Sequence, residues 1–162
     1  MDDQIKSAFL NRPDLHVQIE GEFKGWRTWS RDNFETHTGP FWHRMEDDGH
    51  IRCAVRVEQK HLNGMKNVHG GALMAFADYC LFAIAAPVLQ GPGVTVSFAC
   101  EFLDAAREGE LVEGSGEIMR AGGSMIFLRG LLKSGERPLF TFSGTIKRVK
   151  RRTPPAASDD AG

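Results

Sequence analysis

The sequence predicts a single α+β domain in which an antiparallel sheet curls around one long, buried helix. Its 162 residues suit one domain, and a chain of this length can bury a sizeable core without disulfides or metals. Segment 72–88 is rich in helix formers and apolar on nearly every side, so protein must surround it. Segments with the two-residue alternation of β-strands precede and follow it, and only a curled sheet covers such a helix.

Two strands are expected before the helix. Asp47-Asp48-Gly49 separates segment 41–46 from segment 50–58, which predicts a hairpin turn. In the second segment, apolar residues alternate with residues expected to face solvent. The apolar set is Ile51, Cys53, Val55 and Val57, and the alternating set is Arg52, Ala54 and Arg56.

Four strands are expected after the helix, at 94–102, 111–120, 124–133 and 138–149. Glycine-containing turns separate several of them, and meander connections predict antiparallel pairing. In the first strand, an apolar set alternates with a smaller or more polar set. The apolar set is Val94, Val96, Phe98, Cys100 and Phe102, and the other is Thr95, Ser97, Ala99 and Glu101.

Residues 39–149 make up the predicted domain, with less regular segments on either side. Residues 1–38 form a lead-in with a short helix expected at 2–10. The aromatic-rich stretch 16–42 is interpreted as a loop or lid over the core. Residues 150–162 combine basic residues, prolines and small polar residues, which predicts a frayed, disordered tail.

Composition excludes several classes of partner. A net charge of −1 gives no reason to expect nucleic acid or an anionic membrane. The first ten residues lack the apolar core of a signal peptide, and Asp78 and Pro87 interrupt the longest apolar stretch, so no membrane span is expected. Three cysteines without a C-x-x-C pair indicate reduced thiols in a cytoplasmic protein. The histidines lack the spacing of metal ligands, so no metal site is expected.

Asp78 is the one acidic residue inside the apolar helix. Burying a neutral polar group without a hydrogen bond costs on the order of 2–7 kcal/mol, and burying an unpaired carboxylate costs more. Asp78 therefore either reaches solvent through a gap, accepts hydrogen bonds from neighbouring backbone, or serves as a catalytic carboxylate in a dry site.

The residues just before the helix strengthen the catalytic interpretation. His69-Gly70-Gly71 stands where the helix is expected to begin. A helix N-terminus presents unpaired N–H groups and a partial positive charge, and glycines let a ligand oxygen approach closely. These are the requirements of an oxyanion hole. The glycines also suit a plain turn into the helix.

Gly70 and Asp78 cannot reach one carbonyl carbon from the same chain. They are eight positions apart, which corresponds to roughly 12 Å along a helix. If both groups act together, the carboxylate must come from a second copy. A two-fold dimer would then contain two equal sites at its interface.

The segment from Gly39 to Val149 resembles the hotdog acyl-CoA thioesterases, and its nearest branch looks like the phenylacetate-pathway type. The resemblance lies in Asn63 followed by His69-Gly70-Gly71, then Asp78, and then Val94-Thr95-Val96 at the start of the next strand. The turn Arg120-Ala-Gly-Gly-Ser124 also fits. The resemblance to this family implies a hotdog fold and a homodimer whose two sheets join edge to edge, commonly as a dimer of dimers. It also implies acyl-CoA as the substrate, without a cofactor.

The resemblance also implies residue roles. Gly70 would donate its N–H to the thioester oxygen, with Gly71 beside it. Asp78 of the partner chain would attack the carbonyl or activate water, and Thr95 would hold that water or orient Asp78. Asn63 would position water or the carbonyl, and His69 would brace Asn63 or the thioester. Substrate contacts would come from Gly71, Arg120, Gly122, Gly123 and Ser124.

Other assignments stay open at this stage. Candidates for the CoA phosphates are Arg120, Arg129, Lys147 and Arg148, each also explained as a solvated surface residue. Candidates for the acyl pocket are Met74, Phe76, Tyr79 and Phe82, each also explained by core packing. Two other functions fit the same fold: an acyl-CoA hydratase or dehydratase, which would use a catalytic histidine, and a non-catalytic acyl-CoA-binding dimer.

Overall fold

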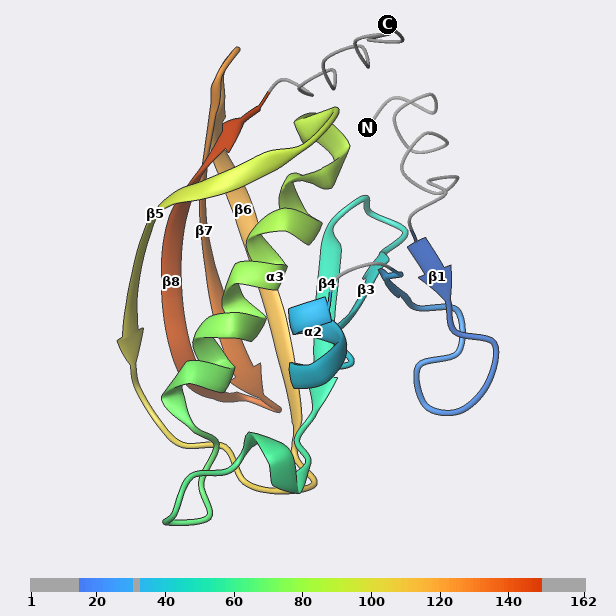
Figure 1. Ribbon diagram of the computed structural model, residues 1–162, viewed down its shortest axis with the longest axis vertical. Helices are drawn as coiled ribbons and strands as arrows, with labels where there is room; N and C mark the ends of the chain where they lie inside the picture. The colour runs from blue at the N-terminus through green and yellow to red at the C-terminus, as the bar shows by residue number, and fades with distance from the viewer. Residues whose placement is uncertain (1–14, 31–32, 150–162) are drawn as a thin grey trace, which may run out of the picture.

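The computed structural model describes residues 15–30 and 33–149, in which one antiparallel sheet curls around a long helix (Figure 1). The strand order is β1-β2-β3-β4-β6-β7-β8-β5. The strands are β1 (Leu15–Val17), β2 (Arg27–Trp29), β3 (Trp42–Met45), β4 (Ile51–Arg56), β5 (Gly93–Phe102), β6 (Leu111–Ala121), β7 (Met125–Ser134) and β8 (Arg137–Arg148). The helices are α2 (Asn33–Thr38) and α3 (Gly70–Leu89), with a 3-10 turn at Gln59–His61. The predicted α+β architecture is confirmed. The helix expected at 2–10 and the tail at 150–162 lie outside the described residues.

The hairpin between β3 and β4 forms where the sequence predicts it. Met45 lies opposite Ile51 in the register, and Gly49 takes a positive φ of 87° that glycine adopts without strain. The prediction of one wet face on β4 is wrong at Ala54, which is fully buried. Trp26 and Trp42 pack with it in a second, smaller apolar cluster on the outside of the sheet.

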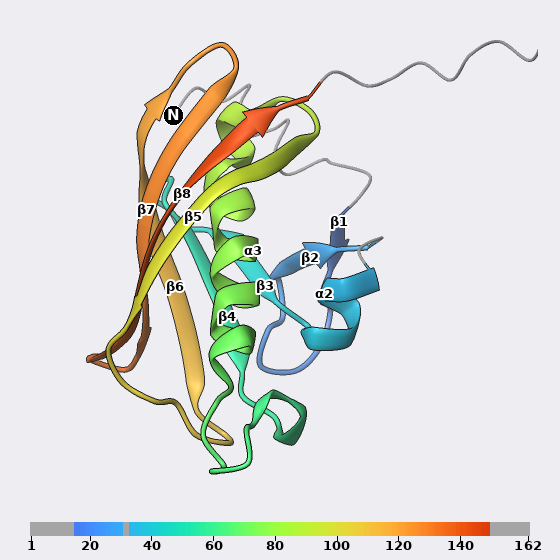
Figure 2. The ribbon, with the colours of Figure 1, turned by 60° about the vertical axis from the view of Figure 1, so that its left-hand side comes forward.

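The lead-in is more regular than a loop or lid. β1 pairs with β2, and β2 reaches β3 through Arg27 opposite His43, so this segment extends the sheet. The lid interpretation holds for α2 only, because α2 lies on the side of α3 that faces away from the long strands (Figure 2). The sequence lacks a clean alternation here because β1 and β2 span only three residues each.

The strands after α3 form at the predicted positions, but they do not all follow a meander. β5 pairs with β8 rather than with β6, and β6 pairs with β4. Segment 103–110 therefore crosses past the start of α3, where Val68 donates its N–H to the Ala106 carbonyl at 2.8 Å. This strand order follows from the burial of α3. Because α3 is apolar on most sides, strands must pack against it from more than one side.

Glycines on the sheet let α3 approach closely. A Cβ added at Gly114 would lie 2.5 Å from the Cys80 Sγ atom, and one at Gly144 would lie 2.4 Å from a Leu81 methyl. The helix spans 20 residues, with most of its side chains buried. By length and composition alone it is long and apolar enough to cross a membrane, because Asp78 and Pro87, expected to interrupt this stretch, lie within one continuous helix. Its apolar character is explained by burial in the sheet.

Candidate active site

The start of α3 leaves one backbone donor available. His69 is the N-cap, and its Nδ1 atom accepts a hydrogen bond from the Gly71 N–H at 2.9 Å. The Gly70 N–H has no acceptor among the residues that the structure describes. This end of the helix therefore offers the Gly70 N–H to a ligand oxygen, whereas the Gly71 N–H is already engaged.

Asn63 is placed in the loop before α3, and its side chain closes that loop. The Oδ1 atom accepts from the Met65 N–H at 2.9 Å and from the Asn67 N–H at 3.2 Å. No hydrogen bond between the side chains of Asn63 and His69 is found within residues 33–149. The side-chain oxygen of Asn63 thus stabilises the turn, and only the side-chain NH₂ group is available to a ligand.

Asp78 lies on the part of α3 that faces the beginning of β5. The Thr95 hydroxyl donates a hydrogen bond of 2.7 Å to the Asp78 Oδ1 atom. Asp78 is only partly buried, so it neither faces open water nor sits sealed in the core. The structure therefore joins two of the residues named from the sequence.

A β-bulge explains how Thr95 reaches Asp78. Strict alternation would place Thr95 on the opposite face from Phe98 and Cys100, which pack against the core. The register of β5 against β8 shifts between Thr95 and Ser97, so Val96 is an extra residue. The bulge turns Thr95 toward the helix, a common use of bulges near functional groups.

A cavity of about 300 Å³ opens beside Asp78. Its other walls come from the lead-in, from the second half of α3 and from the turn into β5. These lining residues are Trp29, Glu35, Phe82, Leu89, Gly91, Pro92 and Gly93. Sequence reasoning named Phe82 but missed Trp29 and Glu35, because nothing in their local pattern indicates that the lead-in folds back onto α3.

The remaining acyl-pocket candidates divide between core and surface. Phe76 and Tyr79 are each 1% exposed, whereas Met74 is 42% exposed. The Tyr79 hydroxyl lies 2.6 Å from the Nδ1 atom of the fully buried His43. Burial raises the pKa of Tyr79 well above its ordinary value, so its phenol stays protonated. Tyr79 is thus a core residue with a satisfied hydroxyl.

The turn between β6 and β7 lies at the far end of α3 from Gly70. Arg148 holds this end together, because its guanidinium donates to the Val88 carbonyl at 2.5 Å and also to the Leu89 carbonyl. It donates to the Gly122 carbonyl at 3.3 Å as well. Arg148 therefore satisfies carbonyls that the helix end leaves unpaired, and the structure does not present it as a free phosphate ligand. Arg120, Gly123, Ser124 and Lys147 are exposed at the same end.

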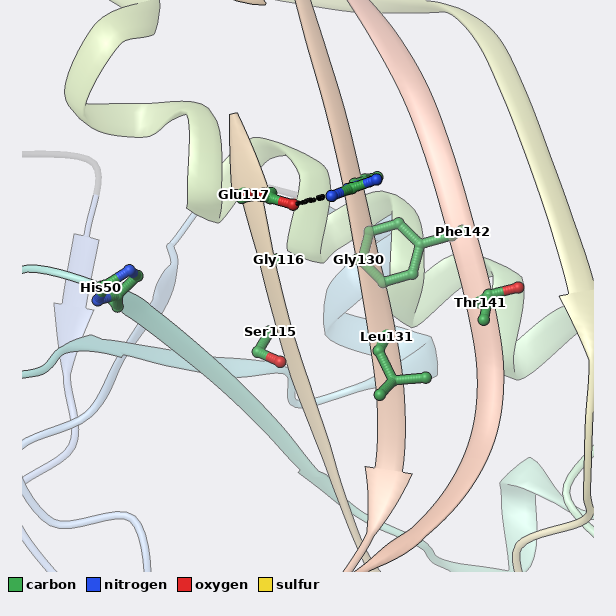
Figure 3. Close-up of a pocket in the computed structure, with 9 residues that line it drawn as sticks. His50, Ser115, Gly116, Glu117, Gly130, Leu131, Thr141 and Phe142 are labelled. Carbon is green, nitrogen blue, oxygen red and sulfur yellow. Dashed lines mark hydrogen bonds and ion pairs between the residues drawn. The ribbon is translucent and has the colours of Figure 1, made fainter. Parts of the chain in front are cut away.

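A second hollow, of about 530 Å³, lies on the outer face of the sheet. Figure 3 shows Ser115, Glu117, Leu131 and Thr141 around it on β6, β7 and β8, with α3 behind the strands. Arg129 pairs there with Glu117 at 2.6 Å. This hollow is separated from Asp78 by the sheet, so neither it nor Arg129 belongs to the site around Asp78.

Within one chain, the donor and the carboxylate remain apart. Phe102, at the end of β5, packs against Gly70, since a Cβ there would lie 2.9 Å from its ring. Thr95, at the start of β5, lies against Asp78. β5 thus runs beside α3 with Gly70 near one end and Asp78 near the other. A single copy contains both chemical groups but does not bring them together.

The chain is similar to known proteins in sequence and in fold. Residues 65–141 match the family model of the thioesterase superfamily. A protein of Pseudomonas aeruginosa named as an esterase is 34% identical over 110 residues, which are 67% of this chain and 82% of that protein. Human acyl-coenzyme A thioesterase 13 is 25% identical over 96 residues, covering 59% of this chain and 69% of the human protein.

Among solved structures, a variant of the phenylacetic acid degradation protein PaaI from Thermus thermophilus superposes with a TM-score of 0.64. It is 24% identical and covers 73% of this chain and 100% of its own. This likeness in fold confirms the expected hotdog architecture. The family match and the fold agree with the resemblance found in the sequence, and the chain therefore belongs to the thioesterase superfamily and has the hotdog fold.

Proposed function

We propose that this protein hydrolyses acyl-CoA thioesters to a free acid and CoA at two equal sites between two copies of the chain. The observation that carries the proposal is the position of Asp78. This carboxylate belongs to an otherwise apolar helix, lines a cavity and accepts a hydrogen bond from Thr95. The name of the human relative, an acyl-coenzyme A thioesterase, supports the choice of substrate.

The exposed edge of β5 supports the dimer. β5 is ten residues long and ends the sheet, and its apolar side chains Val94 and Val96 are 46% and 49% exposed. A long apolar edge strand presents unpaired backbone groups to another strand. A second β5 satisfies these groups, and two antiparallel copies related by a two-fold axis make the same contact twice.

The same pairing completes the site. A two-fold axis at Ala99 places Ala99 opposite its own copy and, because the bulge adds Val96 as an extra residue, places Thr95 opposite Phe102 of the partner subunit. Because Phe102 packs on Gly70 and Thr95 binds Asp78 within each chain, this register brings Asp78 near Gly70 of the partner subunit. The donor and the carboxylate then flank one thioester carbonyl.

Hydrolysis needs little beyond these groups. In the proposed path, Asp78 removes a proton from water while the water oxygen bonds to the thioester carbon. The Gly70 N–H of the partner subunit stabilises the negative charge on the carbonyl oxygen. The carbon–sulfur bond then breaks, and the CoA thiolate leaves and takes up a proton. Thr95 keeps Asp78 oriented, and no metal or redox cofactor takes part.

The alternative role for Asp78 is direct attack, which forms an anhydride that water opens later. A single turnover in heavy-oxygen water separates the two paths. The label enters only the product acid if Asp78 activates water, whereas label in the Asp78 carboxylate shows direct attack followed by opening of the anhydride at the Asp78 carbonyl.

We extend the proposal to assembly and location. Two such dimers associate as a tetramer, which the molecular mass in solution tests. Cys53, Cys80 and Cys100 are free thiols in the structure, which supports a cytoplasmic location.

Replacement of Asp78 by Asn tests the proposed reaction. CoA release from a panel of acyl-CoA substrates is expected to fall by about 10²–10⁴-fold, because the catalytic base is lost, while circular dichroism shows an unchanged fold. Asp47→Asn, in the exposed hairpin turn, is the matched control. A wild-type rate in Asp78→Asn contradicts the mechanism, and enoyl-CoA hydration without CoA release would identify a hydratase instead.

A further inference from the structure

One stripe of α3 stays open in a single chain. Between residues 73 and 86, Met74, Ala75, Asp78 and Phe82 are exposed or partly exposed, whereas the other side chains are buried. Residues three and four apart lie on the same face of a helix, so these four form one continuous line. Met74 is 42% exposed. The stripe therefore places an open apolar side chain one helical turn before the Asp78 carboxylate.

The proposed dimer brings Met74 to the two-fold axis. In that dimer Asp78 lies near Gly70 of the partner subunit, so the axis crosses α3 level with the residue midway between these two positions, which is residue 74. Four residues separate Met74 from each of them, which corresponds to roughly 6 Å along the helix. β5 runs beside α3 at the free edge of the sheet (Figure 1) and meets the same proposed axis at Ala99. Two methionines, one from each chain, then lie between the two reacting centres.

Two directions lead away from each reacting centre. The first follows the cavity of about 300 Å³ beside Asp78, whose lining includes the exposed turn Gly91-Pro92. The CoA arm ends in charged phosphates that must reach solvent, so it suits this direction. The second direction leads along α3 toward the axis, where the partly buried side chains of Phe98 and Cys100 on β5 are apolar and Met74 closes the space. An apolar acyl group suits this enclosed direction.

We infer that the acyl group points toward the two-fold axis and that Met74 of both subunits sets the longest acyl group that the protein accepts. The inference rests on the proposed function, because only the dimer proposed there brings the two methionines together. A methionine side chain is unbranched and flexible and fills irregular space, so two of them close the axis to an acyl chain. Acyl groups that end before the axis fit, whereas longer ones must displace the methionines.

Substitutions at Met74 test the length limit. Met74→Ala removes most of the wall from both subunits at once. The ratio of kcat/KM for dodecanoyl-CoA to that for butanoyl-CoA is expected to rise at least about tenfold, because one methylene more or less in an apolar pocket changes kcat/KM by about 10–200-fold. Met74→Leu, which keeps a large apolar side chain, should retain the wild-type ratio. Met119→Ala, at a methionine that is 53% exposed on β6, is the matched control and should also retain it.

Chemical cross-linking tests the position of Met74 without an assay of activity. Met74→Cys is made together with Cys100→Ala, because Cys100 lies next to the proposed axis and would react itself. Treatment with a short bifunctional maleimide is expected to join the two chains into a covalent dimer on a denaturing gel. Cys53 and Cys80 are 0% exposed and should not react. The Cys100→Ala protein alone is the control and should stay a single chain on the same gel.

The outcomes separate the inference from the proposed function. A covalent dimer at position 74 together with a raised chain-length ratio in Met74→Ala supports the inference. CoA release with the same ratio in wild type and Met74→Ala would overturn the inference alone. A dimer that releases CoA but does not cross-link at position 74 would also overturn it. A monomeric protein, or one that releases no CoA from any acyl-CoA, would overturn the proposed function.

Discussion

At the start of α3 the functional group is a backbone amide, whereas eight residues further along the helix it is a side-chain carboxylate. The first is produced locally: His69 caps the helix, engages the Gly71 N–H and leaves the Gly70 N–H available. The second depends on distant parts of the chain, because Thr95 reaches Asp78 only through the bulge in β5.

The Gly70 amide and the Asp78 carboxylate therefore depend on different parts of the fold. Helix geometry by itself presents the amide, since the first N–H groups of any helix lack an intrahelical acceptor. The carboxylate needs a neighbour that orients it, a cavity beside it and, in the proposed dimer, a second copy that brings an amide to it. Substitutions at the two ends should therefore fail for different reasons.

The largest effect is expected when pairing along the β5 edge is blocked, because in the proposed dimer this pairing brings Gly70 of one chain near Asp78 of the other. Val94→Lys combined with Val96→Lys places charges on the exposed edge of β5, which disfavours strand pairing. The protein is expected to become monomeric by light scattering and to lose at least the 10²–10³-fold contribution that an oxyanion donor typically makes. Ile19→Lys, at a side chain that is 72% exposed outside β5, is the control. A monomer with full activity would show that each chain works alone.

Removal of the amide at the helix start is expected to cost less. Gly70→Pro deletes the N–H at the first helical position, where proline is tolerated, and His69 has the extended backbone (ψ 135°) that proline requires before it. We expect kcat to fall by about 10²–10³-fold. Gly70→Ala is the matched control, because its Cβ meets the Phe102 ring as proline would but keeps the N–H. Equal losses in the two variants would assign the effect to crowding.

The smallest effect is expected at the residue that orients the carboxylate. Thr95→Val removes the hydroxyl that binds Asp78 Oδ1 and keeps the shape of the side chain. A hydrogen bond to a charged group contributes about 1.5–3 kcal/mol, so a loss of about tenfold or more in kcat is expected. Thr95→Ser should restore most of the rate in the same assay. If the valine variant were as active as wild type, Thr95 would have no part in orienting Asp78.

The sequence predicted more of the fold than of the site. The central helix, the β3–β4 hairpin and the strands after α3 all appear at the expected positions, because their periodicity and turn residues are local signals. The order of β5 in the sheet was missed, since no local pattern records which strand pairs with which. Ala54 was assigned to the wet face because the sequence does not show that Trp26 covers it.

For the site, the sequence by itself determined which groups are present. Asp78 stands out because a carboxylate is costly in an apolar helix, and Gly70 stands out because glycines precede that helix. Only the tertiary structure decided how these groups are used. It turned Thr95 toward Asp78 through a one-residue bulge, engaged Arg148 at the end of α3, and folded Glu35 and Trp29 onto the cavity. The physical reason is that such contacts join residues far apart in the chain, and their geometry depends on the packing of the whole sheet around the helix.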